Sequence, residues 1–423
     1  VKAGKVPLRA FVAQLSFDEL EAVSRGDYKM NSPLGPEGNA GAFGGVLPSL
    51  NKKGVPPVIT TDGPSGIRLK CASSLLPIGT LLACTFDEAL VSEVCAGVGG
   101  EMKERGSDVL LAPGMNIQRS PLCGRNFEYY SEDPVLSGKI AAAAVRGIQR
   151  AGVSACPKHF ACNDQEFNRN NHDARVSERA LREIYLKGFE ICVREANPHC
   201  IMTSYNKVNG VWAHYHFELV RGILRGEWGF GGCVMTDWWM KSARCPEDPR
   251  LKDNAYRIRA GVNVLMPGGD YFGKRKPDGT VRAALKKGGL TMAELRRNAE
   301  EVLSFVLHSS AEMKEVWKAF VGRILCRLCA LLGYLRLSKR PSSFAQAPRL
   351  GRACFPNLRF NFQRGISNHE YITHHGQGRF SAPCRSGGTA FDRAPCQRDV
   401  RGCLGGGRCG GQNAVCAPSR ARL

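Results

Sequence analysis

The feature that most constrains the fold of this chain is a regular alternation of short apolar runs with longer stretches of helical periodicity. Apolar runs of about four to eight residues between turn signals are typical of buried strands, and longer stretches with apolar positions three and four apart are typical of amphipathic helices. The runs expected to be strands are 57–61, 109–113, 153–156, 200–203, the run that ends at Asp237, and 262–266. The stretches expected to be helices are 86–106, 134–150, 177–196, 217–227 and 292–308, the last opened by a Thr291/Glu294 capping box.

This alternation predicts an α/β fold with a parallel sheet and helices outside it. No Gly-x-Gly-x-x-Gly follows the first expected strand, and about 300 residues run in one series, which suits a barrel better than a doubly wound sheet. We therefore expect residues 1–318 to form a (β/α)8, TIM-like barrel.

Residues 319–423 are expected to form a separate, irregular tail rich in Arg, Cys and Gly. From residue 321 onward the chain has 17 Lys and Arg against 3 Asp and Glu, while the part before it has 42 against 35, so +14 of the net charge of +21 lies in the last quarter. The rest of the chain carries only +7, which argues against nucleic acid as a partner. The tail shows no strand or helix period, so we expect disorder and hypothesise that it derives from a shifted reading frame.

Cysteine usage and hydropathy point to a cytoplasmic protein with no membrane segment. Ten of the 18 cysteines precede residue 321, and several, such as Cys156, Cys200 and Cys233, lie inside apolar runs, as reduced thiols do. No stretch of about eighteen apolar residues and no leader pattern at the start is present, so neither a membrane span nor a signal peptide is expected. The pair Cys326 and Cys329 has no second ligand pair at finger spacing, so no metal is expected.

Polar residues gather where the expected strands end. In a parallel barrel the carboxyl ends of the strands form one mouth, and active sites lie there. A set of such residues at one edge is hard to ascribe to helix capping alone. They are Asp62, Asn116, Lys158, His159, Tyr205 and Asp237.

The run before Asp237 is followed at once by Trp238 and Trp239. A carboxylate at a strand end can act as a nucleophile, and an indole offers a flat face to a sugar ring. The alternative is an Asp that caps the next helix, with both tryptophans in the core. The octapeptide alone does not decide between them.

With these motifs placed, the chain resembles glycoside hydrolase family 3, in particular its β-glucosidases, across roughly residues 15–315. The motifs follow the family's order, and together they are specific although each alone is weak. They are TDGPSGIR (61–68), LAPGMNI (111–117), GRNFEYYSEDP (124–134), KHFACN (158–163), RVSERALREIY (175–185) and VMTDWW (234–239).

The resemblance implies a retaining glycosidase that acts on terminal β-D-glucosyl residues of a small β-glucoside or oligosaccharide, with no cofactor. Asp237 matches the family's nucleophile, Trp238 the ring platform beside it, and Asp62 the carboxylate that binds distal hydroxyls. An oxocarbenium-like transition state needs such a carboxylate near the anomeric carbon and fixed donors around the hydroxyls. The nearby cations are expected to keep Asp237 ionised. The matching donors around the −1 sugar are Arg68, Arg125, Lys158, His159, Arg169 and Tyr205.

A retaining glycosidase also needs a second carboxyl group as acid and base. In the family's β-glucosidases this glutamate comes from a second α/β domain after the barrel, and that domain is not recognisable here. The acid/base is therefore unassigned, and the chain could be a truncated, weakly active enzyme. One alternative is β-xylosidase specificity, or N-acetylhexosaminidase specificity with His172 as acid/base, although the Pro-Gly-His-Gly context of those enzymes is missing. The other alternative is a non-catalytic sugar-binding barrel.

Overall fold

The computed structural model describes residues 1–268 and 277–309. Its first sheet has the order β1-β2-β3-β4, formed by β1 (Gly41–Gly44), β2 (Pro57–Asp62), β3 (Val109–Leu111) and β4 (Ser154–Ala155). Strands β2, β3 and β4 are parallel, but β1 runs antiparallel to β2, with Gly41 opposite Thr60. The expectation of an all-parallel sheet is therefore wrong at this edge. Strand β1 was not predicted, because the Gly-rich sequence around it carries no strand signal.

The second sheet is parallel throughout and has the order β10-β9-β6. Its strands are β6 (Cys200–Met202), β9 (Cys233–Trp238) and β10 (Val264–Met266). Isolated backbone bridges lie at both edges of this sheet. Phe160, beyond β4, bridges Thr203 beyond β6, and Arg25 bridges Leu265 of β10. The N–H of Asp27 then donates to the carbonyl of Ala42 in β1 over 2.9 Å.

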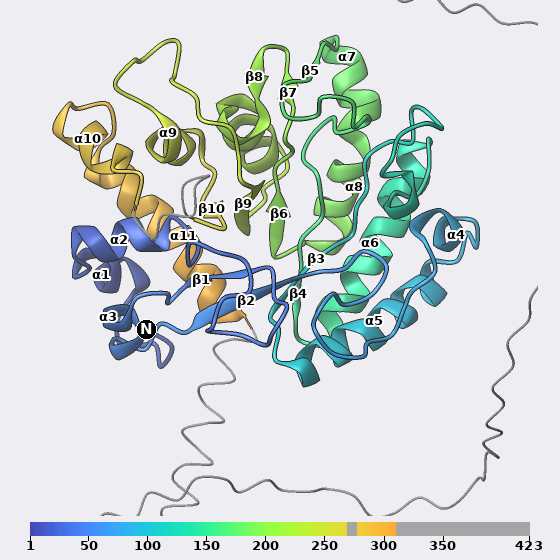
Figure 1. The fold of residues 1–423 in the computed structure, drawn as a ribbon, viewed down its shortest axis with the longest axis horizontal. Coiled ribbons are helices and arrows are strands. Elements are labelled where there is room, and N and C mark those ends of the chain that lie inside the picture. Colours follow the sequence, from blue (N-terminus) through green and yellow to red (C-terminus); the bar gives the residue numbers. More distant parts are fainter. Residues whose placement is uncertain (269–276, 310–423) are drawn as a thin grey trace, which may run out of the picture. The chain divides into compact units, whose positions relative to one another are not determined.

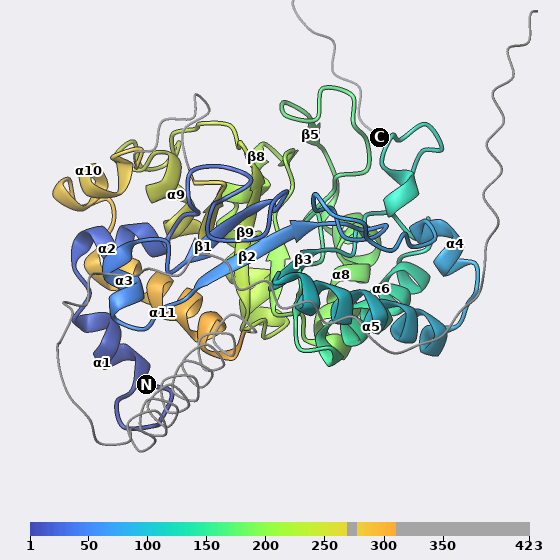
Figure 2. The ribbon, with the colours of Figure 1, turned by 60° about the horizontal axis from the view of Figure 1, so that its bottom comes forward.

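Helices cover the outside of these strands (Figure 1). Helices α5, α6 and α8 lie along β3, β4 and β6, and Figure 2 shows α1, α2, α3 and α11 gathered on the opposite side, where α11 packs against β1 and β9. The helices of the covering layer are α1 (Leu8–Ala13), α2 (Phe17–Val23), α3 (Pro48–Lys52), α4 (Gly79–Ala83), α5 (Glu88–Arg105), α6 (Pro134–Arg150), α8 (Lys187–Ala196), η4 (Glu218–Glu227), α9 (Asp253–Ala260), α10 (Thr280–Lys286) and α11 (Met292–His308). Within the described residues, no helix combines the length and the apolar character that a bilayer-spanning segment needs.

Strands β3, β6 and β9 each contribute side chains to two cores, because successive side chains point to opposite faces. Leu110 of β3 packs in a cluster with residues of α5, α6 and α8. Its neighbours Val109 and Leu111 pack in a second cluster, which also holds Cys200 and Met235 of the other sheet. The strands are thus buried on both faces, as the near-continuous apolar runs predicted.

Helix boundaries follow the capping residues. Thr291 accepts a hydrogen bond from the backbone of Glu294, whose side chain bonds back to Thr291, so the predicted capping box at α11 is confirmed. Ser16 and Glu19 form the same box at α2. The predicted helix 177–196 is divided into α7 (Glu178–Ala180), a π-type turn η2 (Leu181–Tyr185) and α8, because the wider turn shifts the helical register before α8 begins.

A small sheet of three short strands lies over the carboxyl ends of the main strands. Strands β5 (Asp173–Ala174), β7 (Lys207–Val208) and β8 (Val211–Trp212) form it in the order β5-β7-β8. The ten described cysteines are all free, and eight of them are buried, which confirms their prediction as unpaired core residues. The predicted tail, 319–423, lies outside the described residues.

Close packing of α5 on α6 gives a stability prediction. A Cβ on Gly147 of α6 would lie 2.2 Å from the carbonyl oxygen of Ser92 in α5, which is backbone and cannot rotate away. Gly147→Ala should therefore lower the free energy of unfolding by about 1–3 kcal/mol, measured by urea denaturation. Gly97→Ala in α5 is the matched control, since its Cβ would meet nothing within 4 Å. It should stabilise the chain by roughly 0.5–1 kcal/mol through helix propensity, and equal losses in both variants would contradict the packing argument.

Candidate active site

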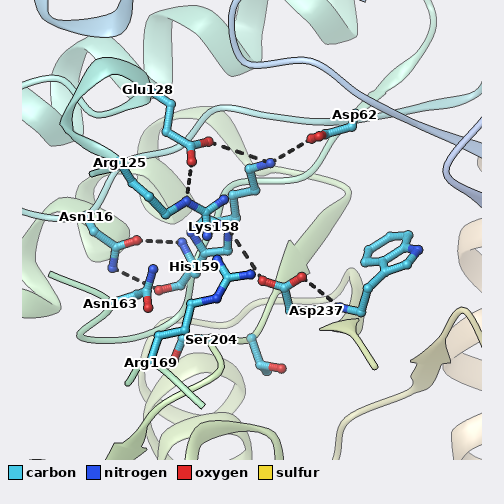
Figure 3. A network of polar contacts seen from close by, with 12 residues as sticks. Asp62, Asn116, Arg125, Glu128, Lys158, His159, Asn163, Arg169, Ser204 and Asp237 are labelled. Atoms are coloured by element: carbon cyan, nitrogen blue, oxygen red, sulfur yellow. Dashed lines mark hydrogen bonds and ion pairs between the residues drawn. The ribbon is translucent and has the colours of Figure 1, made fainter. Parts of the chain in front are cut away.

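The carboxyl ends of β2, β4, β6 and β9 bring most of the predicted site residues together (Figure 3). Asp62 is the last residue of β2, and Asp237 is the fifth residue of β9. Lys158 and His159 follow β4, where Lys158 bridges Gly114 of the chain leaving β3. These residues come from segments far apart in the sequence, and parallel strands place their ends at a common edge.

A chain of alternating charges runs through one side of the site. The Nζ of Lys158 lies 2.9 Å from Asp62 Oδ1 and 3.7 Å from Glu128 Oε2. The other oxygen of Glu128 accepts a hydrogen bond from Arg125 Nε, and the second oxygen of Asp62 lies 3.2 Å from Arg68 Nη1. Burial would raise the pKa of Asp62, but the charges of Lys158 and Arg68 outweigh it, so the pKa is lowered. Burial likewise opposes the charge on Lys158, yet Asp62 and Glu128 raise its pKa.

Asp237 is buried, with 8% of its surface exposed. Its Oδ1 accepts the backbone N–H of Trp238 over 2.7 Å, and its Oδ2 lies 3.6 Å from His159 Nε2. Oδ2 is buried and makes no hydrogen bond of good geometry within the described part of the chain. Of the two carboxylate oxygens, this is the one whose acceptor capacity is unused.

Burial determines the protonation behaviour of Asp237. It raises the pKa of the carboxyl, and the charges of Arg125 and Lys158, the Trp238 N–H and the Tyr205 hydroxyl lower it without cancelling the rise. The nearby cations lower the pKa, as expected of groups that favour the ionised form, but loss of water around the carboxylate is the larger effect. A carboxylate that has lost its water is also a better nucleophile.

His159 is fixed on both sides of its backbone and at its ring. Asn116 accepts its N–H over 2.7 Å and donates to its carbonyl over 2.9 Å, and Nδ1 lies 3.2 Å from the Tyr129 hydroxyl. Burial, followed by the charges of Arg125, Lys158 and Arg169, holds the pKa of His159 well below its usual range. The neutral ring can position Asp237, while the positive charge around the carboxylate comes from the arginines and the lysine.

The far side of the site is formed by residues after β4 and β6. Arg169 pairs with Glu166 over 2.9 Å, and its guanidinium lies 4.4 Å from the centre of the Tyr205 ring. Glu166 also accepts a hydrogen bond from Asn163, over 3.0 Å. Burial and the charge of Asp237 raise the pKa of Tyr205, so its hydroxyl stays protonated and able to donate.

Two predicted residues lie differently from the rest. Trp238 is buried at 5% exposure, and its Nε1 donates to the carbonyl of Ala40 over 2.8 Å. Its neighbour Trp239 is the exposed indole, at 48%. Arg68 extends into solvent beyond Asp62, with 76% of its side chain exposed. The roles of Trp238 as a platform and of Arg68 as a sugar ligand stay predictions.

Glu128 was not predicted as a site residue, although the motif that contains Arg125 also contains it. The two lie three residues apart around the short helix η1 (Asn126–Glu128), which turns both side chains to one side. Glu128 is buried, and both of its oxygens are engaged by cations, Arg125 and Lys158. The i, i+3 spacing with opposite charges was the available signal.

Glu128→Gln should lower kcat/KM by roughly ten- to a hundredfold, because the amide presents an N–H2 group to one of the two cations and displaces it. The measurement is steady-state kinetics on an aryl β-glucoside, the substrate class that the motif resemblance implies, together with urea unfolding to separate misfolding from misplacement. Glu195→Gln is the matched control, since Glu195 pairs with Lys139 at the surface. A loss of kcat/KM equal to that of the control would mean that Glu128 does not position Arg125 and Lys158 for activity.

No acid/base emerges among the carboxyl groups that the structure places in this site. The lowered pKa of Asp62 leaves it without a proton to donate near neutral pH. Both oxygens of Glu128 are engaged by cations, and those of Glu166 are taken by Arg169 and Asn163. His172, the alternative acid/base, lines a different cavity together with Arg119 and Tyr185. In residues 1–268 and 277–309 no group of three or more His, Cys, Asp or Glu side chains is arranged to hold a metal ion.

A buried carboxylate with an unpaired oxygen, close to arginine, lysine, histidine and tyrosine side chains, is an arrangement that glycoside hydrolysis can use. The comparison with known proteins gives the family. The chain belongs to glycosyl hydrolase family 3: the model of that family's N-terminal domain matches residues 46–305. The resemblance predicted from the motifs is thereby confirmed, and the α/β fold with mixed sheets is that of this domain.

The relatives are β-glucosidases. The chain is 46% identical over 321 residues to a β-glucosidase of Ruminococcus albus, covering 75% of this chain and 33% of that protein. It is similar to the crystal structure of a β-glucosidase from Paenibacillus barengoltzii, with 46% identity, a TM-score of 0.69, and coverage of 74% of this chain and 34% of that one. β-Glucosidase 3B of Thermotoga neapolitana, solved in complex with α-D-glucose, matches with 37% identity, a TM-score of 0.65, and coverage of 73% and 43%. The chain thus spans roughly a third to two fifths of the length of these relatives.

Proposed function

We propose that this chain binds the terminal glucosyl unit of a β-glucoside and carries the nucleophile of a retaining glucosidase. The observation that carries the proposal is the pairing of Lys158 with Asp62 beside the buried, half-free carboxylate of Asp237. Asp62, held ionised, accepts hydrogen bonds from sugar hydroxyls, and Lys158 and Arg125 donate to them. Asp237 Oδ2 attacks the anomeric carbon, the aglycone leaves, and a glycosyl–enzyme ester forms.

We further propose that the two sheets form one eight-membered barrel around this site. This barrel has eight members, the segment 24–27 and seven strands. The strands are β1, β2, β3, β4, β6, β9 and β10. The bridges from Phe160 to Thr203 and from Arg25 to Leu265, with the hydrogen bond from Asp27 to Ala42, support this ring. Strand β1 is antiparallel to its neighbour β2 in this ring.

The test is a comparison of two substrates that differ only in their need for a general acid. A 2,4-dinitrophenyl β-glucoside loses its leaving group unaided, whereas an alkyl β-glucoside does not. Turnover of both would mean that an acid/base is present beyond the carboxyl groups described above. A burst of phenolate from the activated substrate alone would mean that the nucleophile acts without one. Binding of glucose with neither reaction would leave a sugar-binding protein and overturn the enzyme proposal.

The pH profile carries a further prediction. The nucleophile must be ionised, so kcat/KM for the activated substrate should fall on the acid side at a pH above 3.8, the ordinary value, because burial raises the pKa of Asp237. Arg125→Met removes the largest opposing charge, which leaves the carboxylate less stabilised and moves this acid limb to still higher pH. Arg182→Met, which removes a surface ion pair with Glu227, should leave the limb in place. A limb that stays put or moves down in Arg125→Met would contradict the assignment.

A further inference from the structure

A second site is a cavity of about 390 Å³. Some of its lining residues are close in sequence to those of the proposed sugar site, but the two sites have different side chains. The walls of the cavity come from the loop after β3, the segment after β4, strand β5 and helix η2. None of the side chains that surround the Asp237 carboxylate lines it. Its size falls within the range of pockets that hold small molecules, roughly 300–1,000 Å³.

The two sites share one wall, the segment 162–166. Asn163 and Glu166 belong to the sugar site, where they bond to each other and to Tyr129 and Arg169. Asp164 and Gln165, between them in sequence, line the second cavity. Successive side chains of one short segment therefore serve two different sites.

The polar groups of this cavity are richer in donors than in acceptors. The Arg119 side chain is exposed and makes no ion pair or hydrogen bond that joins it to another described residue. Gln165 has a buried Nε2 group without a hydrogen-bond partner in the described chain. Arg175, at the rim, is paired with Asp173 over 2.7 Å and retains its remaining N–H groups. Such a set suits a ligand that brings acceptors and negative charge.

Asp164, in the wall of the cavity, repels an anion less than an ionised aspartate would. Asp164 is buried, with 8% exposed, and its Oδ1 accepts the backbone N–H of Ile117 over 3.0 Å. Burial raises its pKa to about 7, against the smaller lowering by that hydrogen bond and by Arg119. The carboxyl can therefore hold a proton near neutral pH and donate it in a hydrogen bond to an incoming oxygen.

The rest of the lining is apolar or aromatic and can pack against the carbon atoms of a ligand. Ala174, Val176 and the ring of Tyr185 form it, so a purely inorganic ion would leave this side without contacts. A ligand with both an apolar face and a carboxylate fits better.

We propose that this cavity binds a small organic carboxylate of about monosaccharide size, with a sugar acid as the fitting class, through Arg119 and Gln165. The cavity is separate from the proposed glucoside site around Asp237, and the proposal does not rest on the proposed enzymatic function.

The test is isothermal titration of the full chain with D-glucuronate in the presence of excess D-glucose. Glucose has the same ring without the carboxylate, so it competes in the sugar site but not here. Binding should be saturable at one site and should survive the glucose. Arg119→Met should weaken it by about tenfold or more, as expected for loss of a charge-assisted hydrogen bond.

Two further variants decide the result. Gln165→Glu adds a negative charge to the wall and should also weaken binding by at least about tenfold. Arg179→Met is the matched control, because Arg179 is an exposed arginine paired with Glu183 outside the cavity. Absence of saturable binding, displacement by glucose, or equal affinity in Arg119→Met and Arg179→Met would each overturn the proposal. Since Arg119 is exposed, Arg119→Met should fold. If Gln165→Glu does not fold, the comparison of Arg119→Met with Arg179→Met decides the proposal.

Discussion

Replacing Asp237 with alanine is expected to reduce turnover of the 2,4-dinitrophenyl β-glucoside by roughly 10⁴-fold or more, a loss typical of removing a catalytic nucleophile. The activated leaving group needs no acid, so the rate of this substrate reports on the nucleophile alone. Sugar binding should survive, because Asp62 and Lys158 pair without any contribution from Asp237. The measurement is the initial rate of phenolate release at saturating substrate, with glucose affinity measured in parallel.

The control for this experiment is Asp248→Ala. Asp248 pairs with Arg250 at the surface and touches none of the site residues, so its loss should leave turnover unchanged. Asp237→Asn gives a second comparison that keeps the shape of the side chain and its hydrogen bond from Trp238. If either Asp237 variant retains more than about a tenth of the activity while glucose still binds, another group is the nucleophile.

Most of the site could be predicted because strand ends are visible in the sequence. A short apolar run marks a buried strand, and the polar residue that follows it must lie at the carboxyl edge of a parallel sheet. This reasoning placed Asp62, Lys158, Tyr205 and Asp237 at one edge, and the structure brings them there. It needs only that these strands are parallel, which the alternation of strands with helices predicts.

Partner choice inside the site could not be predicted in this way. Lys158 meets Asp62 across 96 positions of sequence and also contacts Glu128. Asn116, expected only as a polar residue at a strand end, proves to hold the backbone of His159 through two hydrogen bonds. Such pairings depend on how neighbouring strands are registered, and the pattern of a single strand does not contain that information.

The strand β1 shows the same limit for the fold. Its sequence, Gly-Ala-Phe-Gly, lies in a Gly- and Pro-rich region with little intrinsic strand preference. It becomes a strand because all four residues are buried and pair with β2. Gly44 has φ of 77° where the strand ends, a conformation that strains other residues. Tertiary pairing therefore decided both the existence of this strand and its antiparallel direction.

Replacing Lys158 with methionine is expected to have the second large effect, on stability and binding together. The side chain is 4% exposed and neutralises two carboxylates, so its loss leaves Asp62 with Arg68 alone and Glu128 with Arg125 alone. Breaking a buried charge pair by removing one partner costs about 3–5 kcal/mol. We expect a fall of this size in the free energy of unfolding near neutral pH, measured by urea denaturation.

The same substitution should weaken glucose binding by roughly ten- to a hundredfold, because a charged donor is lost and the pKa of Asp62 rises once its strongest cation is gone. The sign of the pH dependence follows. A lowered carboxyl pKa stabilises the fold above the ordinary value of 3.8, and this contribution fades as the pH falls below it. The difference in stability between the original chain and Lys158→Met should therefore be largest near neutral pH and shrink toward pH 3.

Lys139→Met separates this effect from the loss of any lysine. Lys139 pairs with Glu195 over 2.7 Å, as closely as Lys158 with Asp62, but at the surface, where water screens the pair. It should unfold and bind glucose like the original chain. If Lys158→Met behaved like this control, the buried network would be dispensable. A loss of stability without a loss of glucose affinity would confine Lys158 to a structural role and leave Arg125, Arg169 and Tyr205 as the donors that hold the sugar.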